Sequence, residues 1–196
     1  MIASGATLQK ANLTAAQLNT VDLDEADLRG ANLTKANLQS AKLIQANLSE
    51  ANLREANLTS ANLTAANLSN ANLIKANLWT TNLTAADLSK ANLTNAIIGG
   101  STNLTGANLL GANLVGVSFG NGNLSGANLS KANLCGANLR STNLSGANLT
   151  SADLRGADLR GAYLEKANLK DANISGAILH EAKLTSAIMP DGTTHD

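Results

Sequence analysis

A five-residue period runs through almost the whole chain and limits what it can fold into. Leucine occupies every fifth position from Leu8 to Leu93, and Ile98 continues the series. The series resumes at Leu104, one residue out of step, and ends at Met189. These positions mark 37 repeats in 196 residues, so the repeat itself is the unit from which the fold must be built.

Each repeat has the form Ala-(Asn/Asp)-Leu followed by two variable residues, as in Ala31-Asn32-Leu33. On an α-helix five residues advance by about 500°, so the leucines would spiral around the surface. On a straight strand an odd repeat would place successive leucines on opposite faces. A chain that turns once per repeat keeps Ala and Leu inside, with the turn-stabilising Asn or Asp outside.

This motif, repeated over about residues 4–190, resembles the pentapeptide-repeat family. The resemblance implies an all-β fold, a right-handed quadrilateral β-helix with four repeats per coil. The 37 repeats then make about nine coils, and a strand spacing of ~4.8 Å gives a rod roughly 43 Å long. The ending Ile188-Met189-Pro190-Asp191-Gly192 is similar to that of many cyanobacterial members. We predict a single domain over residues 1–196.

The pattern breaks in the middle of the chain. Ile98 and Leu104 are six residues apart instead of five, beside two glycines, which predicts a bulge over residues 98–104 with both side chains still in the core. Further on, Phe119 takes a leucine position and Gly122 replaces the next alanine. Loss of the alanine methyl group is expected to offset the larger ring.

The two ends of the chain differ. Residues 188–196 are polar and contain a Pro-Asp-Gly turn, so we expect them to form a cap or tail over the last coil. No comparable segment precedes the first repeat, and repeat proteins need covered ends. We therefore expect any homo-oligomer to form through the N-terminal end, where the first coil would be lined by Met1, Ala3, Ala6 and Leu8.

Composition and residue types point away from catalysis. The chain has 14 basic and 14 acidic residues, so its zero net charge does not favour nucleic acid as a partner. No apolar run is long enough to cross a membrane. His180, His195 and Cys135 have no convergent partners in the pattern, so we expect no catalytic residues, no metal site and no bound cofactor.

These observations favour a non-enzymatic structural or protein-interaction module whose protein partner the sequence does not identify. The alternative is a DNA mimic that inhibits or protects a DNA topoisomerase, a role known for some members of the family; the zero net charge disfavours it. Large apolar residues are rare at the two variable positions of the repeat. We therefore predict a partner surface at mid-rod that comprises Ile74, Trp79, Leu110 and Val115.

The sequence also carries hints about its compartment. Many Asn-Leu-Thr and Asn-Leu-Ser triplets match the glycosylation signal, a liability in a eukaryotic secretory pathway. We therefore expect a bacterial-type cytoplasmic protein. The alternative is the periplasm or thylakoid lumen, if a leader peptide has been removed.

Overall fold

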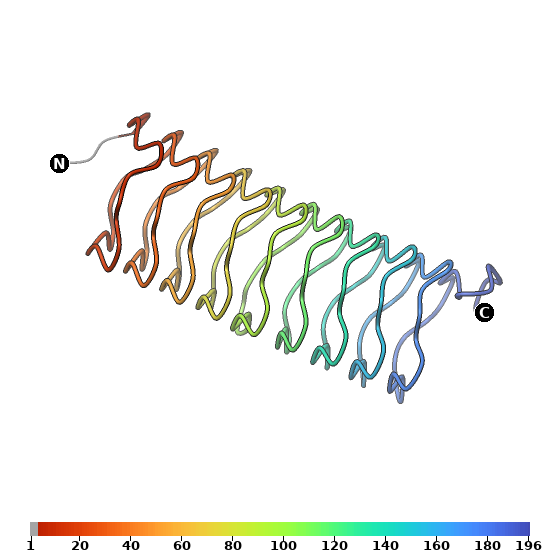
Figure 1. Ribbon diagram of the computed structural model, residues 1–196. Helices are drawn as coiled ribbons and strands as arrows, with labels where there is room; N and C mark the ends of the chain where they lie inside the picture. The colour runs from red at the N-terminus through yellow and green to blue at the C-terminus, as the bar shows by residue number, and fades with distance from the viewer. Residues whose placement is uncertain (1–3) are drawn as a thin grey trace.

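The computed structural model describes residues 4–196 and shows a rod of stacked coils, with the N- and C-termini at opposite ends (Figure 1). Within these residues there is no helix and no strand longer than one bridge residue. Each repeat contributes the residue at its Asn/Asp position to a parallel bridge with a neighbouring coil, as between Asn32 and Asn52. The predicted domain start at Met1 lies outside the described residues.

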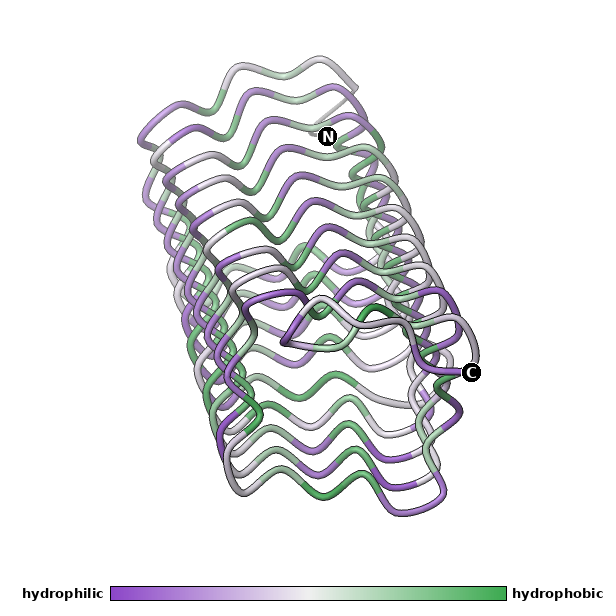
Figure 2. Ribbon diagram, turned by 90° about the vertical axis from the view of Figure 1, so that its right-hand side faces the viewer, coloured by the Kyte–Doolittle hydropathy of each residue, from purple (hydrophilic) through white to green (hydrophobic). Residues whose placement is uncertain are grey.

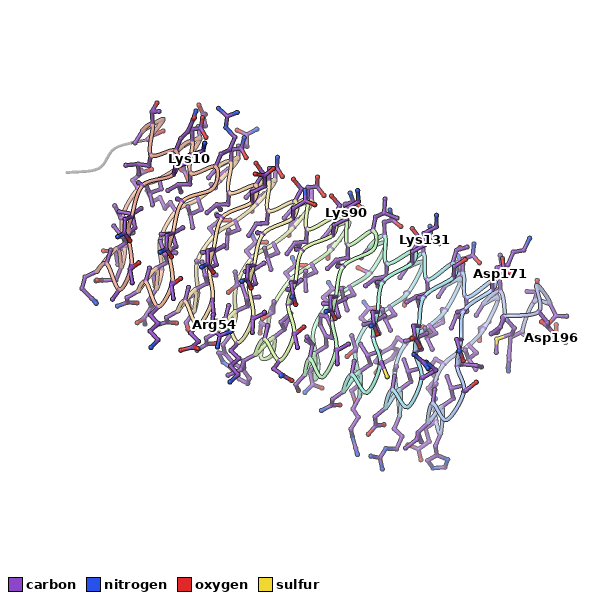
Figure 3. All side chains as sticks on the ribbon, viewed as in Figure 1. Lys10, Arg54, Lys90, Lys131, Asp171 and Asp196 are labelled. Carbon is purple, nitrogen blue, oxygen red and sulfur yellow. The ribbon has the colours of Figure 1, made fainter. Side chains whose placement is uncertain are left out.

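The bridges form four columns, which define the faces of the rod. Each regular pairing joins residues 20 apart, the length of four repeats. We number the faces by the first bridge residue of each column: face 1 starts at Thr7, face 2 at Asn12, face 3 at Gln17 and face 4 at Asp22. Each corner is named for the two faces it joins. Figure 3 shows one edge of the rod, corner 1/2, through its labelled residues Lys10, Lys90, Lys131 and Asp171.

Alanine and leucine form the core. Because they are two residues apart in the repeat, they point to the same side of the chain, and Ala31 and Leu33 are both fully buried. Hydrophilic and hydrophobic residues therefore alternate along the coils (Figure 2). Each buried leucine contributes about 1.5–3 kcal/mol, and this contribution is repeated in every coil.

A regular repeat leaves none of its five backbone N–H groups without an acceptor, as the repeat 31–35 illustrates. The N–H of Ala31 closes a turn on the Leu28 carbonyl, and the N–H of Asn32 bonds the preceding coil. The N–H groups of Leu33 and Lys35 bond the next coil, and that of Thr34 donates to Asn32 Oδ1 at 3.1 Å. The Asn/Asp preference is thus a backbone requirement, because this side chain supplies the fifth acceptor.

The second corner residue adopts a left-handed conformation throughout the rod. Its φ is +57° at Lys35, for example, as a type II turn requires at that position. Glycine fills this position in many repeats, and other residues accept the strain in the rest.

Where the Asn/Asp position holds another residue, the fifth acceptor must come from elsewhere. Lys42 stands at this position on face 4 and cannot accept a hydrogen bond from the Ile44 N–H. Asp24 of the preceding coil accepts it instead, at 2.7 Å. A carboxylate 20 residues away thus restores the pattern.

The core stays continuous through the mid-rod bulge at residues 98–104. Ile98 and Leu104 are both buried, as predicted, and the bridge spacing changes from 20 to 21 residues between Asn77–Ile97 and Asn82–Asn103. The insertion is absorbed at corner 3/4.

Phe119 is fully buried, but Gly122 does not serve the role expected for it. A Cβ on Gly122 would lie 2.8 Å from the Phe119 carbonyl oxygen and 3.9 Å from the Phe119 Cβ. The backbone carbonyl therefore requires the glycine, and the expectation that its missing methyl group makes room for the ring is wrong.

The C-terminal tail folds back on the last coil. Ile188 pairs with Thr194 in an antiparallel bridge, and the His195 N–H donates to the Ala187 carbonyl at 2.8 Å. Ala187 is buried, whereas the last core positions away from the tail stay partly exposed: Ile174, Leu179 and Leu184. At the other end, Ala6 and Leu8 are partly buried, and Met1 and Ala3 lie outside the described residues.

Candidate interaction surface

The corners carry the variable chemistry of this rod. The side chain at the Asn/Asp position is engaged with the backbone, so the two corner residues of each repeat are the ones free to vary. Backbone bonds between coils align these residues in columns that run along the rod. A surface feature on this fold is therefore best described by its corner and its place along the column.

Ile74 and Val115 lie in one column, at corner 2/3. The Glu55 N–H donates to the Ile74 carbonyl, and the Asn95 N–H donates to the Val115 carbonyl. Thr94 stands between Ile74 and Val115 in the column. Both predicted residues are half-buried, so they offer only part of their apolar surface.

Trp79 lies at corner 3/4 and Leu110 at corner 1/2, on opposite edges of the rod. Trp79 is 48% exposed and Leu110 is 37% exposed. The structure therefore places Ile74 and Val115 in one column, two coils apart, with Trp79 across face 3 and Leu110 across face 2. These four residues extend over two faces and do not form a single compact patch.

Sequence reasoning did not single out three of the exposed apolar side chains. Ile97, Tyr163 and Ile178 are 50%, 46% and 45% exposed, and all three stand at the outward Asn/Asp position. The signal that could have found them is the departure itself, because an apolar residue at this position gives up the fifth acceptor. Ile97 lies on face 3, one coil from Asn77 and at the start of the bulge.

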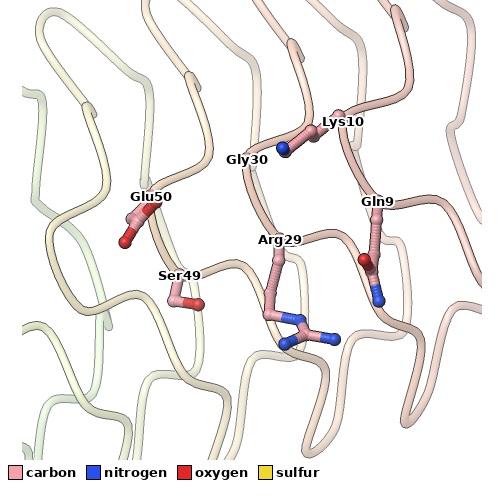
Figure 4. Close-up of a pocket in the computed structure, with 6 residues that line it drawn as sticks. All are labelled: Gln9, Lys10, Arg29, Gly30, Ser49 and Glu50. Carbon is pink, nitrogen blue, oxygen red and sulfur yellow. The ribbon is translucent and has the colours of Figure 1, made fainter.

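A hollow of about 240 Å³ lies at corner 1/2, over three coils near the N-terminus (Figure 4). It is lined by Gln9, Lys10, Arg29, Gly30, Ser49 and Glu50. Arg29 is already engaged, because its Nη2 lies 2.7 Å from Asp27 Oδ2. Hydrogen bonds from Arg29 and Gln9 hold the pKa of Asp27 far below its usual range. The hollow thus has balanced charge and no free cation cluster for an anionic ligand.

Ion pairs of the same kind occur near the C-terminal end. Asp158 accepts hydrogen bonds from Arg160, with Arg140 also close, and these contacts lower its pKa to about 2. Asp153 and Arg155 form an equivalent pair, which also lowers the pKa of Asp153. In each of these pairs the negative charge of the aspartate is neutralised by a neighbouring arginine.

The residues considered for chemistry stay apart. His180 is exposed beside Glu181, His195 belongs to the tail, and Cys135 is a half-buried free thiol at corner 2/3. Over residues 4–196, no group of three His, Cys, Asp or Glu side chains could hold a metal ion. In the same residues no helix has the length and apolar character to cross a membrane.

Comparison with known proteins agrees with this geometry. The pattern of pentapeptide repeats matches residues 4–39, 31–70, 61–100, 101–121, 123–156 and 152–189. No curated protein sequence matches the chain.

Several solved structures are similar. One is HetL, a pentapeptide repeat protein involved in heterocyst differentiation regulation from the cyanobacterium Nostoc sp. strain PCC 7120. It is 38% identical over 98% of this chain and 92% of its own, with a TM-score of 0.50. QnrB1, a plasmid-mediated fluoroquinolone resistance protein, is 20% identical over 93% of this chain and 89% of its own, with a TM-score of 0.78. Rfr23 from the cyanobacterium Cyanothece 51142 is 36% identical over 50% of this chain and 58% of its own, with a TM-score of 0.39.

Proposed function

The chain belongs to the pentapeptide-repeat family, and from this premise we propose that it is a non-enzymatic module that presents side-chain columns to a protein partner. Its fold is a right-handed β-helix, and proteins of this family are generally structural or interaction modules. We further propose that residues 1–196 are one domain of about nine coils, because 37 repeats at four to a coil give that number.

The proposal rests on one contrast. The backbone N–H groups of the regular repeats are all hydrogen-bonded, whereas the two corner residues of each repeat vary in chemistry. In the regular repeats every N–H is already bonded, so recognition falls to the corner side chains. Most of these are small or charged, and the only tryptophan of the chain is half exposed among them. Tryptophan is the kind of residue on which binding energy concentrates at protein interfaces.

We propose that the partner surface comprises Ile74, Trp79, Leu110 and Val115 at mid-rod. Arg54 and Arg155 stand in the same corner column as Ile74 and Val115 and add a charged rim to the apolar centre. The partner would then bind across faces 2 and 3 together, which fits a concave or clamp-like protein surface better than a flat one.

The experiment is affinity capture from the source organism with matched variants. The triple variant Ile74→Ser, Trp79→Ser and Val115→Ser should lose partners that the wild type captures. A second variant, Tyr163→Ser and Ile178→Ser, removes exposed apolar area elsewhere and should keep them. Thermal unfolding of each variant checks that the rod is intact. If the triple variant captures the same partners as the second variant, this surface is not the binding site.

We propose that self-association, where it occurs, uses the N-terminal end. Ala6, Leu8 and Leu13 are core positions that remain partly exposed there. Fusing a bulky soluble domain before Met1 should then suppress an oligomer measured by light scattering. An oligomer that survives the fusion would point to another surface.

Protection of a DNA topoisomerase is the alternative role. Its support is the structural likeness to QnrB1, which at 20% identity concerns the fold alone. The zero net charge of this chain disfavours mimicry of DNA. For the compartment we propose a bacterial-type cytoplasm, on the density of glycosylation signals in the sequence.

A further inference from the structure

Backbone hydrogen bonding between the coils is interrupted at the bulge. From Gly5 to Asp171 the second corner residue of each repeat donates its N–H to a carbonyl of the next coil, with Gly100 as the exception. Within residues 4–196, the Gly100 N–H has no acceptor and the Gly120 carbonyl has no donor. The bonds on either side are intact, from Thr80 to Gly99 at 3.2 Å and from Asn121 to Arg140 at 3.3 Å.

A hollow of about 440 Å³ opens at this point of corner 3/4. It is lined by Gly100, Ser101, Thr102, Asn103, Asn121 and Asn123. In the regular repeats the N–H of the second corner residue points along the rod toward the next coil. The unpaired Gly100 N–H therefore faces the gap that the hollow occupies. Its volume is in the range of small-molecule sites, about 300–1,000 Å³.

The polar groups around the hollow are neutral and partly free. Asn123 Oδ1 accepts the Ser125 N–H at 3.1 Å, but its Nδ2 has no acceptor among the described residues. The side chains of Ser101 and Asn121 have no hydrogen-bond partner within residues 4–196. Together with the broken backbone bond, the site offers both donors and acceptors. No charged side chain lines it.

The indole of Trp79, from the preceding coil, packs on Gly99 and Gly100, and Gly100 also lines the hollow. A Cβ on Gly99 would lie 2.4 Å from Trp79 Cζ3, and a Cβ on Gly100 would lie 2.9 Å from Trp79 Cε2. Both positions therefore require glycine, because a side chain at either one would collide with the Trp79 ring in this position. The indole is held against the corner while 48% of the residue stays exposed.

Neutral hydrogen-bonding groups next to an exposed indole favour a sugar as the ligand. Sugar hydroxyl groups both donate and accept hydrogen bonds, and the apolar C–H face of a sugar ring packs on an indole, whose body is apolar. Phosphate and carboxylate ligands are bound by arginine or lysine, which this hollow lacks. A purely apolar ligand would leave the free amides unpaired.

We propose that corner 3/4 at the bulge binds a neutral oligosaccharide. Trp79 provides the stacking surface, and Ser101, Asn121 and Asn123 provide the hydrogen bonds. This site is separate from the proposed protein-binding role and does not depend on it, although both use Trp79.

The single tryptophan reports binding directly. Titration of the purified protein with neutral hexasaccharides of glucose or N-acetylglucosamine should change the Trp79 emission in a saturable way for at least one of them. The variant Ser101→Ala, Asn121→Gly should weaken that binding about fivefold or more, because it removes two hydrogen-bonding side chains. Glycine suits position 121, where φ is +61°, so the variant should fold.

The matched control is Asn70→Gly, which makes the same change at a left-handed corner position, with φ of +57°, away from the hollow. It should bind like the wild type. Two outcomes would overturn the proposal: no saturable emission change with any neutral oligosaccharide, or equal binding by the Asn70 and Asn121 variants. A response to phosphate or to an acidic peptide instead would show that the hollow is an anion site.

Discussion

At the scale of single residues, the inward positions of face 4 show how a polar group is accommodated in an apolar core. Three fully buried threonines replace alanine there: Thr81, Thr102 and Thr142. Thr81 Oγ1 donates to the Leu58 carbonyl at 2.8 Å, and Thr102 Oγ1 bonds the carbonyls of Leu78 and Gly99. Within residues 4–196, Thr142 Oγ1 is the buried side-chain atom without a partner.

Replacing Thr142 by valine should therefore stabilise the protein. Thr142→Val keeps the shape of the side chain and removes an unsatisfied hydroxyl, so we expect the free energy of unfolding to rise by about 1 kcal/mol. Thr102→Val is the matched control, and it should lower the same quantity because it removes the hydroxyl proton that the Leu78 and Gly99 carbonyls share. Chemical denaturation of both variants measures the difference; shifts of the same sign would contradict the assignment.

At the scale of the repeat, the bulge is an insertion that leaves the rest of the rod in register. Without Ser101, the segment would read as regular repeats, with Thr102 at the alanine position and Leu104 five residues after Ile98. At the extra residue the corner bond between Gly100 and Gly120 is absent and the hollow opens, while the core positions on both sides stay buried.

Deleting Ser101 should close this gap. The deletion restores the five-residue spacing, so the Gly100 N–H should pair with the Gly120 carbonyl, and the thermal unfolding midpoint should rise or stay unchanged. Deletion of Ser60 serves as the control, because it shortens a regular repeat at the same corner and should lower the midpoint. A fall of equal size in both variants would show that the fold needs the bulge.

At the scale of the whole molecule, charge is balanced along the rod as well as in total. Residues 1–103 and residues 104–196 each contain seven basic and seven acidic residues. Several of the acidic groups are also paired locally with arginine. Neither half of the chain therefore has the excess of negative charge that would favour imitation of the phosphate backbone of DNA.

The protein should accordingly fail to inhibit a DNA topoisomerase. Duplex DNA carries about one negative charge per 1.7 Å, so a mimic roughly 43 Å long would need on the order of 25 negative charges. We expect no inhibition at micromolar protein in a supercoiling assay. An inhibition constant in that range that weakens as salt is added would show that local acidity outweighs net charge.

The sequence by itself determined the properties that repeat along the chain. Which residues face the core, that the chain turns once per repeat, and where the extra residue lies all follow from local periodicity. Ile98 and Leu104 could thus be placed in the core, and Trp79 outside it, from position alone.

Only the tertiary structure decided which residues meet across coils. The Ile44 N–H donates to Asp24, and Trp79 packs on Gly99 and Gly100. The Gly100 N–H lacks the acceptor that its counterparts find on the next coil. All of these relations join residues about 20 positions apart. A five-residue period does not determine that distance, because it leaves open how many repeats close a coil. The site at the bulge depends on these pairings and could not be predicted from the pattern alone.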